Sequence, residues 1–370
     1  MEILIDARGA SDIPLPQESN LYSVYLRWAL QHPDVNFKWM LQPGEIPPEF
    51  ANINSLHIPR LPDTFAALQQ WYKKELPRIW DVRIPDLFVP VHGLVATHLN
   101  VPQMTWMIQS PGRHFLEKRF ISRWQYRRKL PAMLKKAKGG WITDNGWMWM
   151  EQPSSELDLS CWQMVTPVAV SDIFSKANES ALYDIDYQTG GKPFFASFVS
   201  GVYPTDTMQL MKSFSFFKKR QQTDWKLLLI GDKGADYAEL KRAIESYKYK
   251  DDVVLLEATK RDKLIALDLA YALVQAKGQQ LPSSLLLMAL EQSAAIILAE
   301  KTPTADWMGD APIIAKGTEP ADVAESMMLL YKDEELAKER RTGSRQLFNQ
   351  LTLENQAEKA FANITTTLQV

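Results

Sequence analysis

The stretch Ala272–Leu298, ALVQAKGQQLPSSLLLMALEQSAAIIL, contains the pattern that decides the fold. A short apolar run at Ala272–Val274 predicts a buried strand, and a second run at Ala295–Leu298 predicts another. Between them, Ser283–Gln292 has the length and the apolar content of a helix. A helix that connects two buried strands is typical of a parallel β-α-β unit, in which the helix covers one face of the sheet.

The same alternation extends outward over the whole chain. In the second half, the further predicted strands are Phe194–Val199, Lys226–Ile230 and Val253–Leu256. The further predicted helices there are Asp206–Arg220, Tyr237–Tyr247, Arg261–Leu267, Ala321–Tyr331, Glu334–Arg341 and much of Leu351–Thr367. In the first half, the predicted strands are Ile3–Asp6, Asn36–Leu41, Leu87–Val91, Met104–Ile108, Trp141–Thr143 and Met164–Val168. The predicted helices there are Leu21–Leu30, Thr64–Leu76 and Phe115–Lys138.

Two such series predict an α/β protein with two facing Rossmann-like domains, joined near the Gly-Gly turn within Asp184–Lys192. A length of 370 residues suits two domains. We expect a first domain over residues 1–190 and a second over 191–350, with a helix in 351–370 that crosses back to the first. Ligands of such sheets bind beyond the carboxyl ends of the strands, so we expect the site between the domains.

Composition excludes several classes of protein. Lys and Arg number 42 against 44 Asp and Glu, which argues against a nucleic-acid binder held by bulk charge. A single cysteine, Cys161, excludes an internal disulfide framework. The chain opens on a strand-like segment rather than a signal peptide, and no apolar run is long enough to span a membrane. We therefore expect a cytoplasmic protein.

The short motifs of common enzyme classes are absent. The sequence has no Walker loop, no His-Glu-x-x-His and no Gly-x-Ser-x-Gly. No Gly-x-Gly-x-x-Gly follows the first strand, which argues against a nicotinamide dehydrogenase. His92 and His98 stand six positions apart with no third ligand at metal-site spacing, so we expect no metal cofactor.

The segment Arg113–Lys138 is strongly basic, with ten Lys and Arg residues against one acid, Glu117. It also contains aromatic residues, among them Phe120 and Trp124. One interpretation is a basic amphipathic helix that contacts the inner face of an anionic membrane or a polyanionic acceptor. The other is a solvated helix whose aromatic side chains pack inward.

Tryptophan is concentrated in the first half, where ten of the twelve tryptophans lie within the first 162 residues. Such residues are core residues when buried, because each removes a large apolar area from water. Indole rings can also stack on sugars, and Trp147 and Trp149 are the best candidates for that role.

In the order and spacing of its elements, the chain resembles the retaining family-four (group 1) glycosyltransferases, which have the GT-B fold. The segment Ile3–Arg8 resembles the first strand of that family, and Ile84–Val89 resembles the strand before its acceptor loop. Phe198–Phe217 resembles the strand, loop and helix that carry the donor-phosphate residues. Ala272–Ile297 is similar, without a gap, to the unit that carries two glutamates eight positions apart. The resemblance implies a nucleotide-sugar donor and a glycan or lipid-linked acceptor.

The residues that the family uses are replaced in this chain. Gln280 and Met288 stand at the two glutamate positions, and Thr205 and Asp206 stand where a basic pair binds the donor diphosphate. Gln109 and Ser110 stand at the His-Asp of the acceptor loop. The candidate donor-side residues are Gly201, Thr205, Asp206, Lys233, Lys263 and Lys277, and the candidate acceptor-side residues are Gln109, Ser110, Arg113 and His114. Glu291, one helical turn after Met288, is the candidate substitute carboxylate.

These replacements bear directly on sugar transfer. The leaving diphosphate must be stabilised by positioned cations as its charge develops. A carboxylate at that place would repel it by about 4 kcal/mol at about 4 Å and an effective dielectric constant near 20. Methionine cannot accept a hydrogen bond from a hydroxyl group as glutamate does.

Two functions therefore stay open. The first is a divergent glycosyltransferase that moves a sugar from a nucleotide sugar to a glycan or lipid-linked acceptor. The second is a non-catalytic relative that keeps the scaffold and binds a glycan or a protein partner. An epimerase on the same fold is disfavoured, because the second half of the chain has no histidine for acid-base chemistry.

Overall fold

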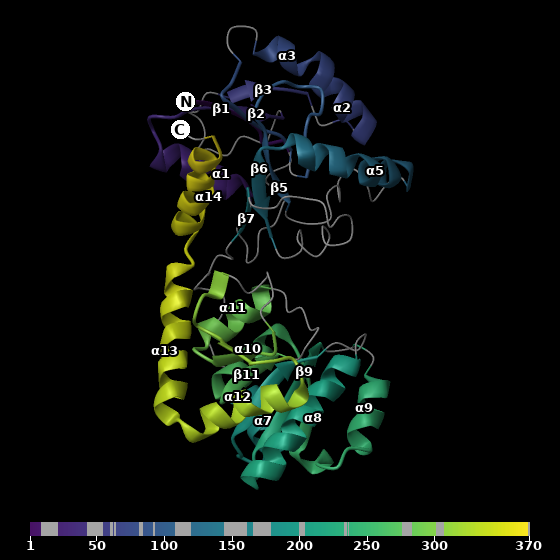
Figure 1. Ribbon diagram of the computed structural model, residues 1–370, viewed down its shortest axis with the longest axis vertical. Coiled ribbons are helices and arrows are strands. Elements are labelled where there is room, and N and C mark those ends of the chain that lie inside the picture. Colours follow the sequence, from purple (N-terminus) through teal and green to yellow (C-terminus); the bar gives the residue numbers. More distant parts are fainter. Residues whose placement is uncertain are drawn as a thin grey trace. The chain divides into compact units, whose positions relative to one another are not determined.

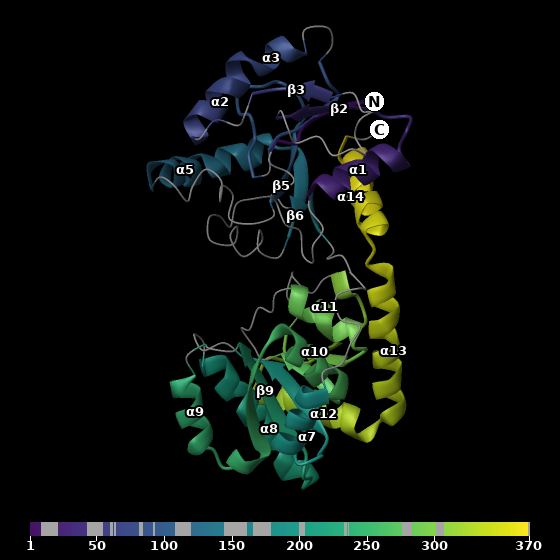
Figure 2. The ribbon, with the colours of Figure 1, turned by 180° about the vertical axis from the view of Figure 1, so that it is seen from behind.

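The computed structural model describes residues 1–8, 21–42, 55–59, 62, 64–80, 84–91, 93–107, 120–143, 161–165, 179–199, 204–232, 235, 237–275, 283–300 and 307–368 (Figures 1 and 2). The chain forms two compact units. The first consists of Met1–Val168 together with Leu351–Val370, and the second of Ala169–Gln350.

Parallel strands form the centre of the first unit. Four of them, in the order β3-β2-β1-β4, are β3 (Ser55–His57), β2 (Asn36–Leu41), β1 (Glu2–Asp6) and β4 (Leu87–Val89). Three more, in the order β5-β6-β7, are β5 (Met104–Met107), β6 (Gly139–Ile142) and β7 (Trp162–Met164). A parallel bridge between Phe88 and Gln103 joins β4 to the start of β5, so the strands follow one another in the order 3-2-1-4-5-6-7.

Helices cover both faces of these strands. On one face lie α1 (Leu21–Gln31) and α14 (Leu353–Leu368), which share one apolar cluster with the sheet. On the other lie α2 (Phe65–Lys74), α3 (Leu76–Ile79) and α5 (Phe120–Lys136), which share a second cluster. Coverage of both faces explains why every residue of β1 is buried.

Four tryptophans form the centre of the first cluster. Trp28, Trp39, Trp106 and Trp141 are completely buried. The rings of Trp106 and Trp141 stack with 4.6 Å between their centroids, and Trp28 lies 5.3 Å from Trp141. These four are therefore core residues and not platforms for sugars. Trp147 and Trp149, the best candidates for sugar stacking, lie outside the described residues.

Two of these indoles hold the C-terminal helix. Trp28 donates its Nε1–H to the Ala357 carbonyl of α14 at 2.8 Å, and Trp141 donates to the Ala360 carbonyl at 2.9 Å. The small side chains of both alanines are buried, which lets the helix backbone come close to the rings. The expected return of the C-terminal helix to the first domain is confirmed.

We expect Trp28→Phe and Trp141→Phe each to lower the free energy of unfolding by about 2–4 kcal/mol, because each removes a buried hydrogen bond and leaves a void. Urea unfolding measures the effect. Trp80→Phe is the matched control, because Trp80 is only partly buried and packs on the opposite face. Equal losses in all three variants would contradict a special role for the α14 contacts.

A second parallel sheet forms the centre of the other unit. Its strands are β8 (Phe194–Phe198), β9 (Lys226–Asp232), β10 (Val253–Ala258), β11 (Ala272–Gln275), β12 (Ala295–Leu298) and β13 (Ile313–Ile314), in the order β10-β9-β8-β11-β12-β13. Its helices are α7 (Glu179–Thr189), α8 (Pro204–Gln221), α9 (Ala238–Glu245), the 3-10 turn η3 (Lys250–Asp252), α10 (Lys260–Leu269), α11 (Ser283–Glu291), α12 (Pro320–Lys332) and α13 (Glu334–Gln350). The expected α/β class with two Rossmann-like bodies is confirmed.

Helix α7 was not expected from the sequence, and it changes where the units divide. We placed the boundary at residue 190, whereas the structure divides the chain after Val168 and puts α7 in the second unit, against α10 and β10. Among the α7 side chains that the structure describes, only Ile185 and Thr189 are buried. These two positions alone do not form the apolar stripe by which a helix is predicted from sequence. The short strands β3 and β13 were missed because two or three residues show no periodicity.

Helix α11 ends on a residue in the left-handed conformation. Ser293 has a φ of 55°, and the Ala294 amide donates to the Ala289 carbonyl at 2.9 Å, as in a Schellman motif. This place is usually occupied by glycine, because a Cβ atom is strained there.

Ser293→Gly should raise the free energy of unfolding by about 0.5–1 kcal/mol, because the relief of strain outweighs the greater freedom of glycine in the unfolded chain. Thermal and urea unfolding both measure this change. Gly309→Ala is the control with the opposite expected sign. Gly309 has a φ of 55° and open space around the added Cβ. The variant's free energy of unfolding should therefore fall by about 1 kcal/mol, because only the backbone strain changes. Shifts of the same sign in both variants would refute the argument.

Candidate functional site

The strand order places the candidate site of each unit. In an open parallel sheet, ligands bind at the carboxyl ends of the strands, where the order of the strands reverses. In the first unit the reversal lies between β1 and β4, and in the second between β8 and β11. The residues that end these strands and their neighbours therefore form the two candidate sites.

In the second unit, the described residues at this edge include two carboxylates that are paired with lysines. Asp232 ends β9 and is largely exposed, and Glu257 lies at the end of β10. Lys263 from α10 forms an ion pair with Asp232, and its Nζ lies 5.9 Å from the centroid of the Phe198 ring. Lys241 from α9 forms an ion pair with Glu257 at 2.7 Å. Lys241 and Lys263 are thus each matched to a carboxylate.

Helix α8 brings a further acid to the same edge. Asp206 lies in the first turn of α8, which follows β8. A carboxylate is favourable there, because the N-terminal end of a helix carries a partial positive charge. The same end of a helix would otherwise attract a phosphate group. Asp206 therefore carries a negative charge at a position where the resemblance implies a basic residue that binds the donor diphosphate.

The positions that the resemblance gives to glutamate are only partly described. Met288 lies in the middle of α11 and is 3% exposed, so its thioether is packed in the interior. Glu291 is the last residue of α11, and its carbonyl accepts a hydrogen bond from Arg345 at 2.5 Å. The two residues share one helix, but only Glu291 is partly exposed.

The remaining expected site residues cannot be placed. Thr205 lies within α8, but its side chain is not described. The residues outside the described part of the chain are Gln109, Ser110, Arg113, His114, Gly201, Lys233, Lys277 and Gln280.

The candidate site of the first unit contains a buried ion pair that the sequence did not reveal. Asp6 ends β1, and Arg8 follows two residues later; both side chains are fully buried. Arg8 donates from Nε to Asp6 Oδ1 at 2.8 Å and from a terminal nitrogen to Oδ2 at 2.6 Å. The guanidinium also donates to the Pro59 carbonyl at 3.0 Å and lies 4.2 Å above the Trp71 ring. A bidentate pair of this kind fixes the geometry of both side chains.

A tyrosine extends this ion pair to β4. Tyr72 donates its hydroxyl hydrogen to Asp6 Oδ2 at 3.0 Å, and its oxygen accepts from the Val91 amide at 3.2 Å. Burial, and then the charge of Asp6, raises the pKa of Tyr72 well above its ordinary value, so the hydroxyl stays protonated and donates. Asp6, Arg8 and Tyr72, here called the Asp6 cluster, join the ends of β1 and β4 with the segment after β3. The cluster is fully buried, and it fixes the backbone at the carboxyl ends of β1 and β4.

Asp6→Asn should lower the free energy of unfolding by about 3–5 kcal/mol, because it leaves the Arg8 guanidinium buried without a countercharge. Tyr72→Phe removes only hydrogen bonds and should cost about 1–3 kcal/mol. Denaturant unfolding compares the two variants. If Tyr72→Phe costs as much as Asp6→Asn, the ion pair is not the dominant interaction of the cluster.

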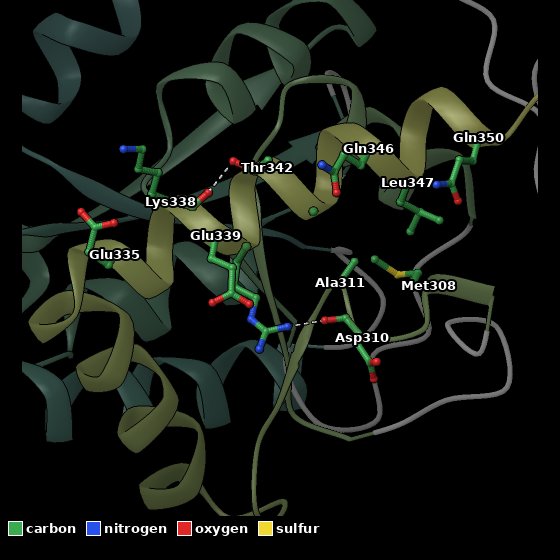
Figure 3. A pocket seen from close by; sticks show the side chains of 12 residues that line it. Met308, Asp310, Ala311, Glu335, Lys338, Glu339, Thr342, Gln346, Leu347 and Gln350 are labelled. Atoms are coloured by element: carbon green, nitrogen blue, oxygen red, sulfur yellow. Dashed lines mark hydrogen bonds between the residues drawn. The ribbon is translucent and has the colours of Figure 1, made fainter.

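A cavity of about 630 Å³ lies in the second unit and is lined by α13 and the segment Met308–Ala311. Figure 3 shows the side chains that line it. Arg340 donates to the Asp310 carbonyl in its wall. Helix α13 also bonds to the residues that precede β11 and β12: Arg341 donates to the Tyr271 carbonyl at 3.0 Å, and Ser344 to the Ala294 carbonyl at 2.9 Å. This cavity therefore belongs to the amino ends of the strands, opposite the edge where ligands of such sheets bind.

Two further properties of the described residues bear on the expectations. No group of three His, Cys, Asp or Glu side chains within the described ranges is arranged to hold a metal ion. Nor does any helix in those ranges have the length and apolar character that a membrane crossing requires.

Sequence comparison and structural comparison give different results. No family model matches the chain, and no curated protein matches it in sequence. A glycosyltransferase from Rickettsia africae matches in structure with a TM-score of 0.57 at 11% identity, over 100% of this chain and 98% of the other. Anabaena HepE in complex with UDP-glucose matches with 0.53 at 12% identity, over 99% and 100%. Sucrose-phosphate synthase from Thermosynechococcus elongatus matches with 0.51 at 12% identity, over 100% and 99%.

These similarities extend over the full length of both chains and therefore include both units and the C-terminal helix. At 11–12% identity, these similarities establish the fold alone. The chemistry of the chain has to be inferred from its own residues. The chain has the two-domain GT-B fold of these proteins.

Proposed function

We propose that this protein is a non-catalytic member of the GT-B glycosyltransferase-fold proteins, which uses the scaffold to bind a glycan or a protein partner. The observation that supports this function best is the charge at the carboxyl edge of the second sheet. There, Asp206 lies in the first turn of α8, and Lys263 is paired with Asp232.

Sugar transfer from a nucleotide sugar releases a diphosphate, and catalysis requires preorganised cations where its charge develops. Lys263 could act as such a cation only if its ion pair with Asp232 were broken. The freed carboxylate would then lie beside the diphosphate and repel it. The local electrostatics thus oppose the donor that the fold is known to accommodate in relatives.

The apolar residue Met288 in α11 also supports the non-catalytic function. Met288 is packed in the interior and offers no group that accepts a hydrogen bond from a sugar or ribose hydroxyl. Glu291 lies one turn later and replaces the carboxylate only if a ligand reaches the end of the helix.

Active glycosyl transfer is the second candidate. It is favoured by the fold itself, since Anabaena HepE is described in complex with UDP-glucose. Lys233 comes one residue after the end of β9 in the sequence, and Lys277 comes two residues after the end of β11. They would supply the cations in this case.

Isothermal titration calorimetry with UDP, GDP and UDP-glucose separates the two candidates. We expect dissociation constants weaker than about 1 mM, which corresponds to about −4 kcal/mol. Asp206→Lys should tighten UDP binding several-fold, since it converts repulsion into attraction at the N-terminal end of α8. Asp268→Lys is the control for net charge, because Asp268 is exposed and lies near the C-terminal end of α10. A micromolar dissociation constant in the unmodified protein would contradict the non-catalytic function.

A further inference from the structure

Two tyrosines of α7 lie together on the surface of the second unit. Tyr183 and Tyr187 stand four positions apart and are 69% and 76% exposed. Their rings lie nearly parallel, at 17°, with 6.3 Å between the centroids. A single exposed aromatic residue is ordinary, but two that lie together leave a large apolar area in water and are typical of a binding surface.

The opposite side of α7 attaches the helix to its unit. Ile185 and Thr189 are buried, and α7 packs against α10 and β10. With the period of an α-helix, these two residues lie on the side opposite the tyrosine pair. The tyrosines therefore face away from the sheet, on a helix whose other side is packed.

Acidic residues flank the tyrosines on both sides. Asp184 and Asp186 are exposed, and the period of the helix places one on each side of the tyrosine pair. The sequence of α7 contains three acids and no lysine or arginine. The first base after the helix, Lys192, forms an ion pair with Asp224 at 2.6 Å. The helix therefore presents two aromatic rings between carboxylates.

The C-terminal end of α7 adds to this negative character. The Gly191 amide donates to the Asp186 carbonyl at 2.9 Å, and the Gly190 amide donates to the Tyr187 carbonyl at 3.2 Å, as in a Schellman motif. The C-terminal end of a helix carries a partial negative charge, and α7 has no basic residue in its last turn. A cation bound beside Tyr187 would therefore be favoured by the end of the helix as well as by the aspartates.

Aromatic rings and carboxylates together favour arginine over lysine. A guanidinium group stacks flat on an aromatic ring and donates two hydrogen bonds to one carboxylate, whereas the ammonium group of lysine is a compact, strongly hydrated charge. The first unit contains this combination in its own interior, where Arg8 lies 4.2 Å above the Trp71 ring and donates two hydrogen bonds to Asp6. On α7 the rings and the carboxylates are exposed, so an arginine from another molecule fits between them.

We propose that this surface, here called the α7 tyrosine face (Tyr183, Asp184, Asp186 and Tyr187), binds an arginine-containing segment of a partner protein. The proposal rests on the proposed function, because it names the chemistry of the protein partner that the scaffold would bind. Its site is separate from the edge considered for nucleotides. Helix α7 leads into β8 within a few residues, so its C-terminal end lies at the amino ends of the strands.

Isothermal titration calorimetry of the full chain with penta-arginine and penta-lysine peptides, in about 0.15 M salt, tests the stacking contact. We expect penta-arginine to bind at least about five-fold more tightly, because the two peptides carry equal charge and arginine stacks better on the rings. Tyr183→Gln/Tyr187→Gln should remove this preference. No binding of penta-arginine at millimolar concentration, or equal affinity of the unmodified protein for the two peptides, would overturn the proposal.

A pair of charge variants tests the aspartates. Asp184→Asn/Asp186→Asn should weaken the binding of penta-arginine at least about ten-fold, because it removes two charge-assisted contacts. Glu239→Gln/Glu245→Gln is the matched control, since it changes the net charge equally on exposed residues of α9, and it should keep binding within about two-fold. Melting temperatures show that the variants fold. Equal losses in both double variants would indicate bulk charge and refute the α7 tyrosine face.

Titrations with maltoheptaose and with UDP separate this proposal from a glycan site and from the proposed function. If maltoheptaose binds, the tyrosine double variant loses that binding and penta-arginine does not bind, the face belongs to a glycan and the proposal is wrong. Micromolar binding of UDP together with an intact preference for penta-arginine would refute the non-catalytic function and support the partner site. Binding of UDP weaker than about 1 mM without that preference would overturn the partner site alone.

Discussion

The contact between two indoles and the C-terminal helix is the constraint on which the first unit depends. A helix backbone has no spare donor to offer in its interior, but its carbonyls can accept a second hydrogen bond. Trp28 and Trp141 use this property at Ala357 and Ala360. The chain end is thereby fixed against a core built from residues more than 200 positions earlier. The abundance of tryptophan in the first half thus has a structural cause.

Most of the fold could be predicted because buried parallel strands are nearly continuous apolar runs. The segment Ala295–Leu298 is strand β12 at the expected residues, and Ser283–Gln292 differs from α11 by one residue. The prediction failed where this signal is weak. Helix α7 buries too little to show a stripe, so the sequence placed the division between the units after it and not before it. Strand β13 has two residues, and no period can be seen in two residues.

For the candidate site, the sequence could predict only which residues of the resembled family are replaced. An alignment by resemblance predicts which family residues are replaced, and Met288, one of those positions, is packed in the interior. It does not show how the replacements interact. The pairing of Lys263 with Asp232 joins residues 31 positions apart. The Asp6 cluster joins Asp6 to Tyr72 across 66 positions. Such pairs follow from the order of strands in a sheet, which no local pattern contains.

The described charges at the carboxyl edge of the second sheet disfavour a phosphate ligand. A lysine paired with a carboxylate gains little from a phosphate, because the ligand must first compete with an internal anion. This is the state of Lys263 at the edge of the second sheet. A phosphate at this edge would have to displace the Asp232 carboxylate before Lys263 could bind it, and part of the free energy of binding would be spent on that exchange.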